Sequence, residues 1–174
     1  MRKTLVTLLN LTMLLISVLI ISGCALKSNL PDAPKGYTWY ENEDIYFAYP
    51  EKWKQTEENS MVQLKPTAGG NNIVVTKGQY DSTLDNISVE TIEALFKPQI
   101  EAQGMKMTNI AVAHDKSKGT DIAVVTYDLS YSGIKMEQTL YMFRIDNYAY
   151  SITVTEAIED LALVQTVLNT LTIK

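Results

Sequence analysis

Residues 148–155 have the sequence YAYSITVT, and this stretch decides the fold. Its large residues, Tyr148, Tyr150, Ile152 and Val154, alternate with small ones. Side chains of a β-strand point alternately to its two faces, so the pattern indicates a strand with one buried face. The flanking sequence is expected to supply both neighbouring strands and a covering layer.

Further strands are predicted upstream, over residues 107–114, 122–131 and 135–145. The four strands are joined by segments whose residues tolerate turn geometry, namely 115–119, Ser132-Gly133 and Asp146-Asn147. Short connections of this kind favour a meander of neighbouring antiparallel strands.

A helix is predicted after residue 155, with Thr155 as its cap. Carboxylates that suit the positive end of a helix follow at Glu156, Glu159 and Asp160. Apolar residues then recur along one side of this helix, at Ile158, Leu161, Val164, Val167, Leu168 and Leu171. An apolar stripe of this length must cover a sheet.

The first half of the chain predicts two strand pairs and a helix. Strands are expected at 37–40 and 45–49, around the acidic turn 41–44, and at 61–64 and 72–77, around Gly69-Gly70. Residues 51–53 are predicted to form a single helical turn that tucks Trp53 under the sheet. A helix capped by Ser88 carries its apolar positions at Val89, Ile92, Leu95, Phe96 and Ile100. Pro98 should break it, leaving a short second piece that ends near Gly104.

These elements predict an α+β domain in which an antiparallel β-sheet has helices packed on its faces. The segment Phe47-Ala48-Tyr49-Pro50-Glu51-Lys52-Trp53 resembles the opening of PsbP-like domains, and residues 167–174 resemble their ending. The resemblance spans residues 37–174 and implies an α-β-α fold. Photosynthetic members of that family support the oxygen-evolving complex, but no residue here matches a metal-binding motif of theirs. No functional residue is therefore carried over.

The first 24 residues predict a lipoprotein signal. Arg2 and Lys3 precede a mostly apolar run over 5–21, and Ile21-Ser22-Gly23-Cys24 resembles a bacterial lipobox. The resemblance implies a diacylglyceryl thioether on Cys24 and cleavage after Gly23. Labelled palmitate should then enter the protein, which would lie on the extracytoplasmic face of the cell membrane. The alternative is an uncleaved transmembrane helix, for which the run is only just long enough.

The predicted organisation is a signal peptide over 1–23, a lipidated cysteine and flexible linker over 24–36, and the α+β domain over 37–174. Residues 24–174 keep all 20 carboxylates and 13 of the 15 basic side chains, so their formal charge is about −7. This balance repels phosphate backbones and anionic headgroups, which argues against nucleic-acid binding and leaves the anchoring to lipid. Cys24 is the only cysteine, so no thiol remains for a disulfide or a catalytic nucleophile.

Candidate site residues all have a plain structural interpretation. His114 is the only histidine and is predicted to be a solvated side chain rather than a general base or metal ligand. The carboxylates Glu41, Glu43, Asp44, Asp81 and Asp85 lack the spacing of a calcium loop and are predicted to be solvated. Most aromatic residues are expected in the core, and those facing away from the helices could form a binding surface. The residues concerned are Trp39, Tyr40, Tyr46, Phe47, Tyr49, Trp53, Tyr127, Tyr131, Tyr141, Phe143, Tyr148 and Tyr150.

No Gly-rich phosphate loop, Gly-x-Ser-x-Gly elbow or His-Glu-x-x-His motif occurs in the chain. The sequence therefore predicts a protein that is not an enzyme, with no cofactor and no metal. The expected function is a non-catalytic binding or assembly-support module of an envelope protein complex. The alternative hypothesis is a lipoprotein that captures a solute or an ion for a transporter, which requires a concave pocket lined by tyrosines and carboxylates.

Overall fold

The computed structural model describes residues 30–157 and 162–174. Within these ranges, ten strands and three α-helices follow one another along the chain. The strands are β1 (Tyr37–Glu41), β2 (Ile45–Pro50), β3 (Lys54–Glu58), β4 (Met61–Lys65), β5 (Asn72–Gln79), β6 (Lys106–Asp115), β7 (Ile122–Tyr131), β8 (Ile134–Ile145), β9 (Tyr148–Ala157) and β10 (Thr172–Ile173). The helices are α2 (Val89–Leu95), α3 (Lys97–Glu101) and α4 (Ala162–Thr170).

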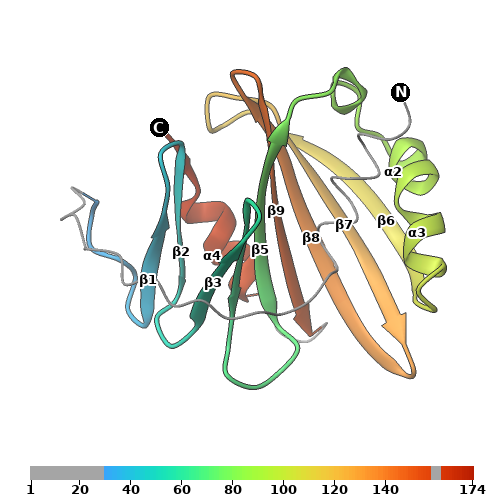
Figure 1. The fold of residues 1–174 in the computed structure, drawn as a ribbon, viewed down its shortest axis with the longest axis horizontal. Coiled ribbons are helices and arrows are strands. Elements are labelled where there is room, and N and C mark those ends of the chain that lie inside the picture. Colours follow the sequence, from blue (N-terminus) through green and yellow to red (C-terminus); the bar gives the residue numbers. More distant parts are fainter. Residues whose placement is uncertain (1–29, 158–161) are drawn as a thin grey trace.

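The described strands form two antiparallel sheets (Figure 1). The large sheet has the order β3-β4-β5-β9-β8-β7-β6, and the small sheet has the order β1-β2-β10. Strands β6 to β9 are the predicted meander, while β5 returns to pair with β9. The pairing places β9, the strand with the alternating sequence, near the centre of the large sheet.

Hydrophobic side chains cover both faces of the large sheet. Along β8, Tyr141 and Phe143 belong to a cluster that includes residues of the small sheet and of α4. The alternate residues Leu140 and Met142 belong to a second cluster, with Ile92 of α2 and Ile100 of α3. Because neighbouring residues of a strand point to opposite faces, α4 and the α2–α3 pair cover opposite sides of the sheet. The predicted α+β class, with helices packed on both faces of an antiparallel sheet, is confirmed.

The break in the middle helix is confirmed, but it falls at Phe96 rather than at Pro98. Ser88 caps α2 through its hydroxyl, which accepts a hydrogen bond from the Thr91 N–H. Pro98 lies in the first turn of α3, where a missing N–H is tolerated. The proline therefore begins the second helix instead of ending the first.

The predicted cap of the last helix is wrong. Thr155 and Glu156 belong to β9, which continues to Ala157, and the helix begins at Ala162. The Glu156 carboxylate, only 1% exposed, accepts hydrogen bonds from the backbone N–H groups of Leu163 and Val164, both at 2.9 Å. A buried side chain of the preceding strand therefore caps α4. The predicted helical positions Ile158, Glu159, Asp160 and Leu161 lie outside the described residues.

Two strands were not expected from the sequence. Strand β3 is a polar edge strand with mostly exposed side chains, so it carries no alternation between apolar and polar residues. Strand β10 consists of two residues that pair with Tyr46 and Ile45 of β2. At the other edge of the large sheet, β6 has a shift in register between Thr108 and Ala111, and Asn109 adopts a φ of 54° there.

The described part of the predicted linker, residues 30–36, contains neither helix nor strand. It is nevertheless bound to the domain, because the Trp39 indole donates a hydrogen bond of 2.7 Å to the Pro31 carbonyl. The Tyr37 N–H donates to the Pro34 carbonyl at 2.9 Å. No helix in the described ranges is long and apolar enough to span a bilayer.

Candidate functional site

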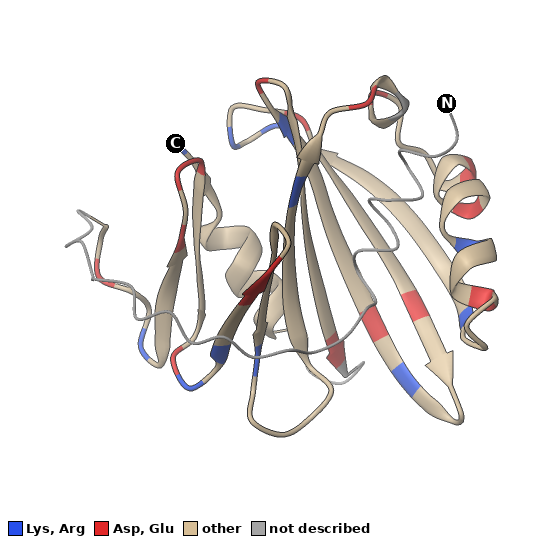
Figure 2. Cartoon of the chain, in the orientation of Figure 1, with Lys and Arg blue, Asp and Glu red and all other residues tan. Residues whose placement is uncertain are grey.

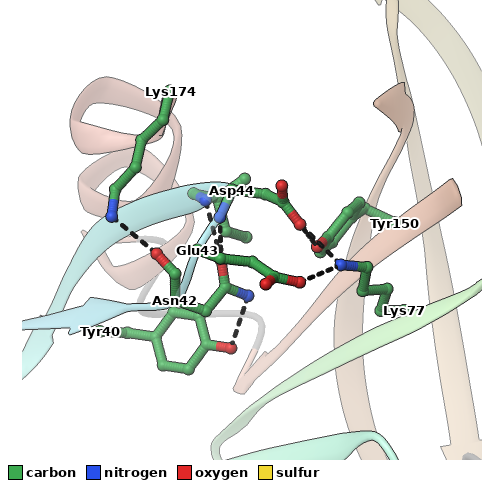
Figure 3. A network of polar contacts seen from close by, with 8 residues as sticks. Tyr40, Asn42, Glu43, Asp44, Lys77, Tyr150 and Lys174 are labelled. Carbon is green, nitrogen blue, oxygen red and sulfur yellow. Dashed lines mark hydrogen bonds and ion pairs between the residues drawn. The ribbon is translucent and has the colours of Figure 1, made fainter. Parts of the chain in front are cut away.

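A cluster of polar side chains lies where the β1–β2 turn meets the large sheet (Figure 3). We call Glu43, Asp44, Lys77 and Tyr150 the Lys77 cluster. The Lys77 ammonium donates to the Asp44 carboxylate at 2.8 Å and also contacts Glu43, while the Tyr150 hydroxyl donates to the same Asp44 oxygen. Lys77 lies opposite Tyr150 in the pairing of β5 with β9, so sheet register alone places them side by side.

The β1–β2 turn is held in a conformation that points the Asp44 side chain toward Lys77 and Tyr150. The Asn42 side-chain oxygen accepts hydrogen bonds from the N–H groups of Asp44 and Ile45, both at 2.9 Å, which is the pattern of an Asx turn. The Asn42 amide also donates to the Tyr40 hydroxyl at 3.1 Å. From the chain end, the Lys174 ammonium donates to the Asn42 carbonyl at 2.7 Å. These contacts with the small sheet, together with the ion pair between Asp44 and Lys77 of the large sheet, fix the turn.

The cluster changes the ionisation of its members. Hydrogen bonds from Lys77 and Tyr150 lower the pKa of the Asp44 carboxyl. Hydrogen bonds to Asp44 and Glu43 raise the pKa of Lys77, and burial raises the pKa of the Tyr150 hydroxyl. The ammonium also lies 4.4 Å from the centroid of the Tyr148 ring, within cation–π range. These shifts keep Asp44 as a carboxylate, Lys77 as an ammonium and Tyr150 as a neutral phenol at neutral pH.

Two members of the Lys77 cluster, Lys77 and Tyr150, line an open cleft of about 250 Å³. We call it the Lys77 cleft, and its lining residues are Tyr40, Glu41, Asn42, Gln55, Glu57, Ser60, Val62, Val75, Lys77 and Tyr150. The lining comes from both sheets, with the edge strand β3 supplying Gln55 and Glu57. Its charged and hydrogen-bonding groups suit a polar or basic group of a partner rather than an apolar ligand.

A second cavity of about 240 Å³ contains the only histidine. His114 Nδ1 lies 3.0 Å from Asp121 Oδ1, and the Arg144 guanidinium lies 4.1 Å from the centroid of the Tyr80 ring. An imidazole held by a carboxylate is the arrangement of a general base. The two hydroxyl groups of the lining are both engaged, however, because Tyr80 donates to Asp85 and Thr120 donates to the Arg144 carbonyl. Neither of these two hydroxyl groups donates to the His114 ring, whose nitrogens face Asp121 and the Ile87 carbonyl.

Several of the predicted solvated side chains have partners. The His114 side chain is 40% exposed and faces Asp121, a pairing that was not among the predictions. Asp44 is only 25% exposed, so the prediction of a solvated carboxylate is wrong there, whereas Glu43 is 74% exposed. Among the described residues, no group of three or more His, Cys, Asp or Glu side chains is arranged to hold a metal ion.

Most of the aromatic residues named above lie in the core, as expected. The buried ones are Tyr40, Phe47, Tyr49, Tyr127, Tyr141, Phe143 and Tyr150. Trp53 follows a turn closed by its N–H on the Pro50 carbonyl and packs partly against the core, as predicted. Tyr131 and Tyr148 are exposed. Tyr150 has a second role that its strand pattern did not reveal, since its ring is buried while its hydroxyl reaches Asp44.

Replacing Asp44 with asparagine should lower the free energy of unfolding at neutral pH and should make that free energy fall less steeply as the pH is lowered. The pKa of Asp44 is lower in the folded than in the unfolded chain, so its contribution is present above about pH 4 and is lost as the pH falls through the folded value. Asp44→Asn should lower the free energy of unfolding by about 1–2 kcal/mol at pH 7. Urea denaturation between pH 2 and pH 7 would measure both effects.

The matched control is Glu43→Gln, because Glu43 contacts the same ammonium but is exposed. Screening by water should keep its effect below about 0.5 kcal/mol. The assigned roles would be contradicted if the two variants lost equal free energy of unfolding. They would also be contradicted if the free energy of unfolding of Asp44→Asn fell with pH as steeply as that of the native chain.

Comparison with known proteins supports the fold and leaves the activity open. No protein-family model and no curated protein matches the chain. The solution structure of cyanobacterial PsbP (CyanoP) from Synechocystis sp. PCC 6803 matches with a TM-score of 0.67 at 12% identity, over 88% of this chain and 99% of that one. The domain therefore has a PsbP-like fold, as the resemblance implied.

Two looser similarities carry no argument about fold or function. A Bacteroides thetaiotaomicron protein matches with a TM-score of 0.49 at 15% identity, over 75% of this chain and 45% of that one. LpqN, which is involved in cell envelope biogenesis of Mycobacterium tuberculosis, matches with a TM-score of 0.44 at 11% identity, over 79% of this chain and 90% of that one.

Proposed function

We propose that this protein is a lipoprotein anchored through Cys24 to the extracytoplasmic face of the cell membrane, where its PsbP-like domain is a non-catalytic binding or assembly-support module of an envelope protein complex. The lipobox-like Ile21-Ser22-Gly23-Cys24 supports the anchor. Lipid on the chain's only cysteine would keep the domain at the membrane, where it can meet membrane-bound partners.

The observation that carries the binding role is the preformed Lys77 cleft. Its lining residues Lys77 and Tyr150 are held by hydrogen bonds to Asp44 of the β1–β2 turn, so a partner would not have to order them first. Glu57 adds an exposed carboxylate to the lining, whereas the Glu41 carboxylate there is already paired with the Lys174 ammonium at 2.7 Å. A protein partner that presents a lysine or arginine side chain would find complementary charge there.

Solute capture for a transporter is the weaker candidate. The two cavities measure about 250 and 240 Å³, whereas pockets that enclose small molecules usually occupy roughly 300–1,000 Å³. The Lys77 cleft is lined mainly by polar groups, whereas the cavity at His114 is also lined by Leu84, Ala123, Met142 and Phe143. An open polar cleft is better suited to a side chain of a protein partner.

Crosslinking in intact cells, followed by purification through the C-terminus, tests the proposal. The native chain should recover at least one envelope protein above background. Glu57→Lys should reduce that recovery about tenfold, because it reverses a charge in the cleft. Glu51→Lys is the matched control, since Glu51 is also exposed but does not line the cleft, and it should recover the same partner as the native chain.

If saturating crosslinker recovers no protein above background, the binding proposal fails and solute capture becomes the better hypothesis. If Glu57→Lys and Glu51→Lys reduced the recovery of the partner equally, the partner would bind the domain at a surface other than the Lys77 cleft.

A further inference from the structure

The two ends of the domain differ in charge (Figure 2). One end is defined by the paired strand termini Tyr37 with Pro50, Lys54 with Lys65, Tyr131 with Ile134 and Lys106 with Ser130. We call it the lysine end, because six lysines lie on it or in the segments that enter it: Lys35, Lys52, Lys54, Lys65, Lys106 and Lys135. Among the described residues, the carboxylates nearest to this end are Glu51, Glu101, the cross-strand pair Asp128 and Glu137, and the buried Glu156 opposite Glu137.

Carboxylates predominate at the opposite end, which we call the acidic end. Its acidic residues are Glu41, Glu43, Asp44, Glu57, Glu58, Asp81, Asp85, Asp115, Asp121 and Asp146, and its basic residues are Lys77, Lys116, Lys118, Arg144 and Lys174. The Lys77 cleft lies at this end. The overall negative charge of the chain is thus concentrated away from the lysine end.

The lysine end also carries an exposed apolar tip. Tyr131 is 52% exposed and Ile134 is 61% exposed, and they face each other across the turn between β7 and β8. Ser132 and Gly133 both have positive φ, at 49° and 84°, as a two-residue hairpin of type I′ requires. The turn therefore holds the two side chains at the end of two long paired strands, beside Lys135 and near Lys106.

The lipid attachment site is close to the same end in sequence. The linker enters β1 at Tyr37, which is part of the lysine end, and its course is held by the contact of Trp39 with Pro31. Cys24 precedes Leu30, the first described residue, by six positions. Even when fully extended, six residues span at most about 20 Å. A short tether of this kind brings the domain itself to the bilayer surface.

We propose that the lysine end rests on an anionic lipid bilayer, with Tyr131 and Ile134 entering the headgroup region. This proposal rests on the lipid anchor at Cys24. Lipid supplies the attachment, while lysines near anionic headgroups contribute about fivefold each to partitioning and set the orientation. Tyrosine suits the interface because its ring is apolar and its hydroxyl is polar. The acidic end is repelled, so the Lys77 cleft faces away from the membrane.

Two matched serine-to-cysteine variants of the full lipidated chain test the orientation. Ser132→Cys places a thiol at the hairpin tip, and Ser117→Cys places one in the exposed β6–β7 turn at the acidic end. Each thiol is labelled with an environment-sensitive fluorophore, and the protein is reconstituted into vesicles of phosphatidylglycerol and phosphatidylcholine that contain a lipid-borne quencher. Quenching at position 132 should exceed quenching at position 117 about fivefold, because a tip that enters the interface lies within about 10 Å of the headgroups.

The charge requirement has its own controls. Adding Lys106→Gln and Lys135→Gln to the Ser132→Cys chain should lower quenching at the tip, whereas Lys116→Gln with Lys118→Gln should not. Vesicles of phosphatidylcholine alone should also lower it. Equal quenching at positions 132 and 117 on vesicle-bound protein would overturn the proposal. It would also be overturned if the ratio of quenching at position 132 to quenching at position 117 were the same on vesicles of phosphatidylcholine alone. Failure of the anchor itself is distinguishable, because an unlipidated Cys24 would take up the label and the chain would not remain with the vesicles.

Discussion

Replacing Glu156 with alanine is expected to lower the free energy of unfolding by about 3–5 kcal/mol, the largest stability effect that we predict for a single side chain. The carboxylate is 1% exposed and accepts the N–H groups of Leu163 and Val164, both at 2.9 Å. Alanine would leave two buried donors without acceptors at the start of α4 and would open a cavity beside them. Because α4 covers one face of the large sheet, the loss should affect the whole domain.

Urea denaturation of three variants would measure this effect. Glu156→Gln keeps the shape and one acceptor oxygen, so it should cost less than alanine, at about 1–3 kcal/mol. Glu57→Ala is the control for an exposed glutamate and should change stability by less than about 0.5 kcal/mol. A loss below about 1 kcal/mol in Glu156→Ala would show that water or another group can cap α4 instead.

Replacing Cys24 with serine should release the protein from the membrane and abolish the incorporation of labelled palmitate. A hydroxyl does not form the thioether, and without acyl chains the domain keeps only its surface contacts with lipid. A single acyl chain already gives an association constant of about 10⁴ M⁻¹, and each further buried methylene adds about 0.8 kcal/mol. The membrane-bound fraction after a high-salt wash should therefore fall at least about a hundredfold.

The position of the thiol provides the matched control. In the chain with both Cys24→Ser and Ser28→Cys, a cysteine is present but no longer follows the lipobox, so neither palmitate nor membrane attachment should return. Cell fractionation and palmitate labelling in the native host measure both. If Cys24→Ser still incorporated palmitate and remained in the washed membrane fraction, the anchor would lie elsewhere in the chain and attachment through Cys24 would be contradicted.

The elements predicted well from the sequence are those with a regular hydrophobic period. Residues 122–131 form β7 as predicted, and the alternation over residues 148–155 identified the strand at the middle of the sheet. Strand β3 was not predicted because a polar edge strand buries neither face, so its sequence has no alternation of apolar and polar residues. The cap of α4 was misplaced because its carboxylate comes from a strand, six residues before the helix begins, rather than from the residue at its start.

The candidate site was less predictable than the fold. Asp44 and Lys77 are distant in the chain, and neither their spacing nor their neighbours indicate an ion pair. The pairing of Lys77 with Tyr150 follows only after the register of β5 and β9 is known. His114 and Asp121 meet because β6 and β7 form a hairpin, which the predicted strands already implied. That pair could have been anticipated, whereas the Lys77 cluster required the contact between two sheets.

The two edge strands of the large sheet affect how readily neighbouring molecules on a membrane could associate edge to edge. One edge, β3, carries Lys54, Glu57 and Glu58, and the other edge, β6, is interrupted near Asn109. Charged and irregular edges hinder the pairing of one chain with the next. Molecules fixed to a surface meet far more often than molecules in dilute solution, so an unprotected edge there would promote fibre-like growth. Once anchored to a bilayer as proposed, the domain is expected to resist this edge-to-edge growth.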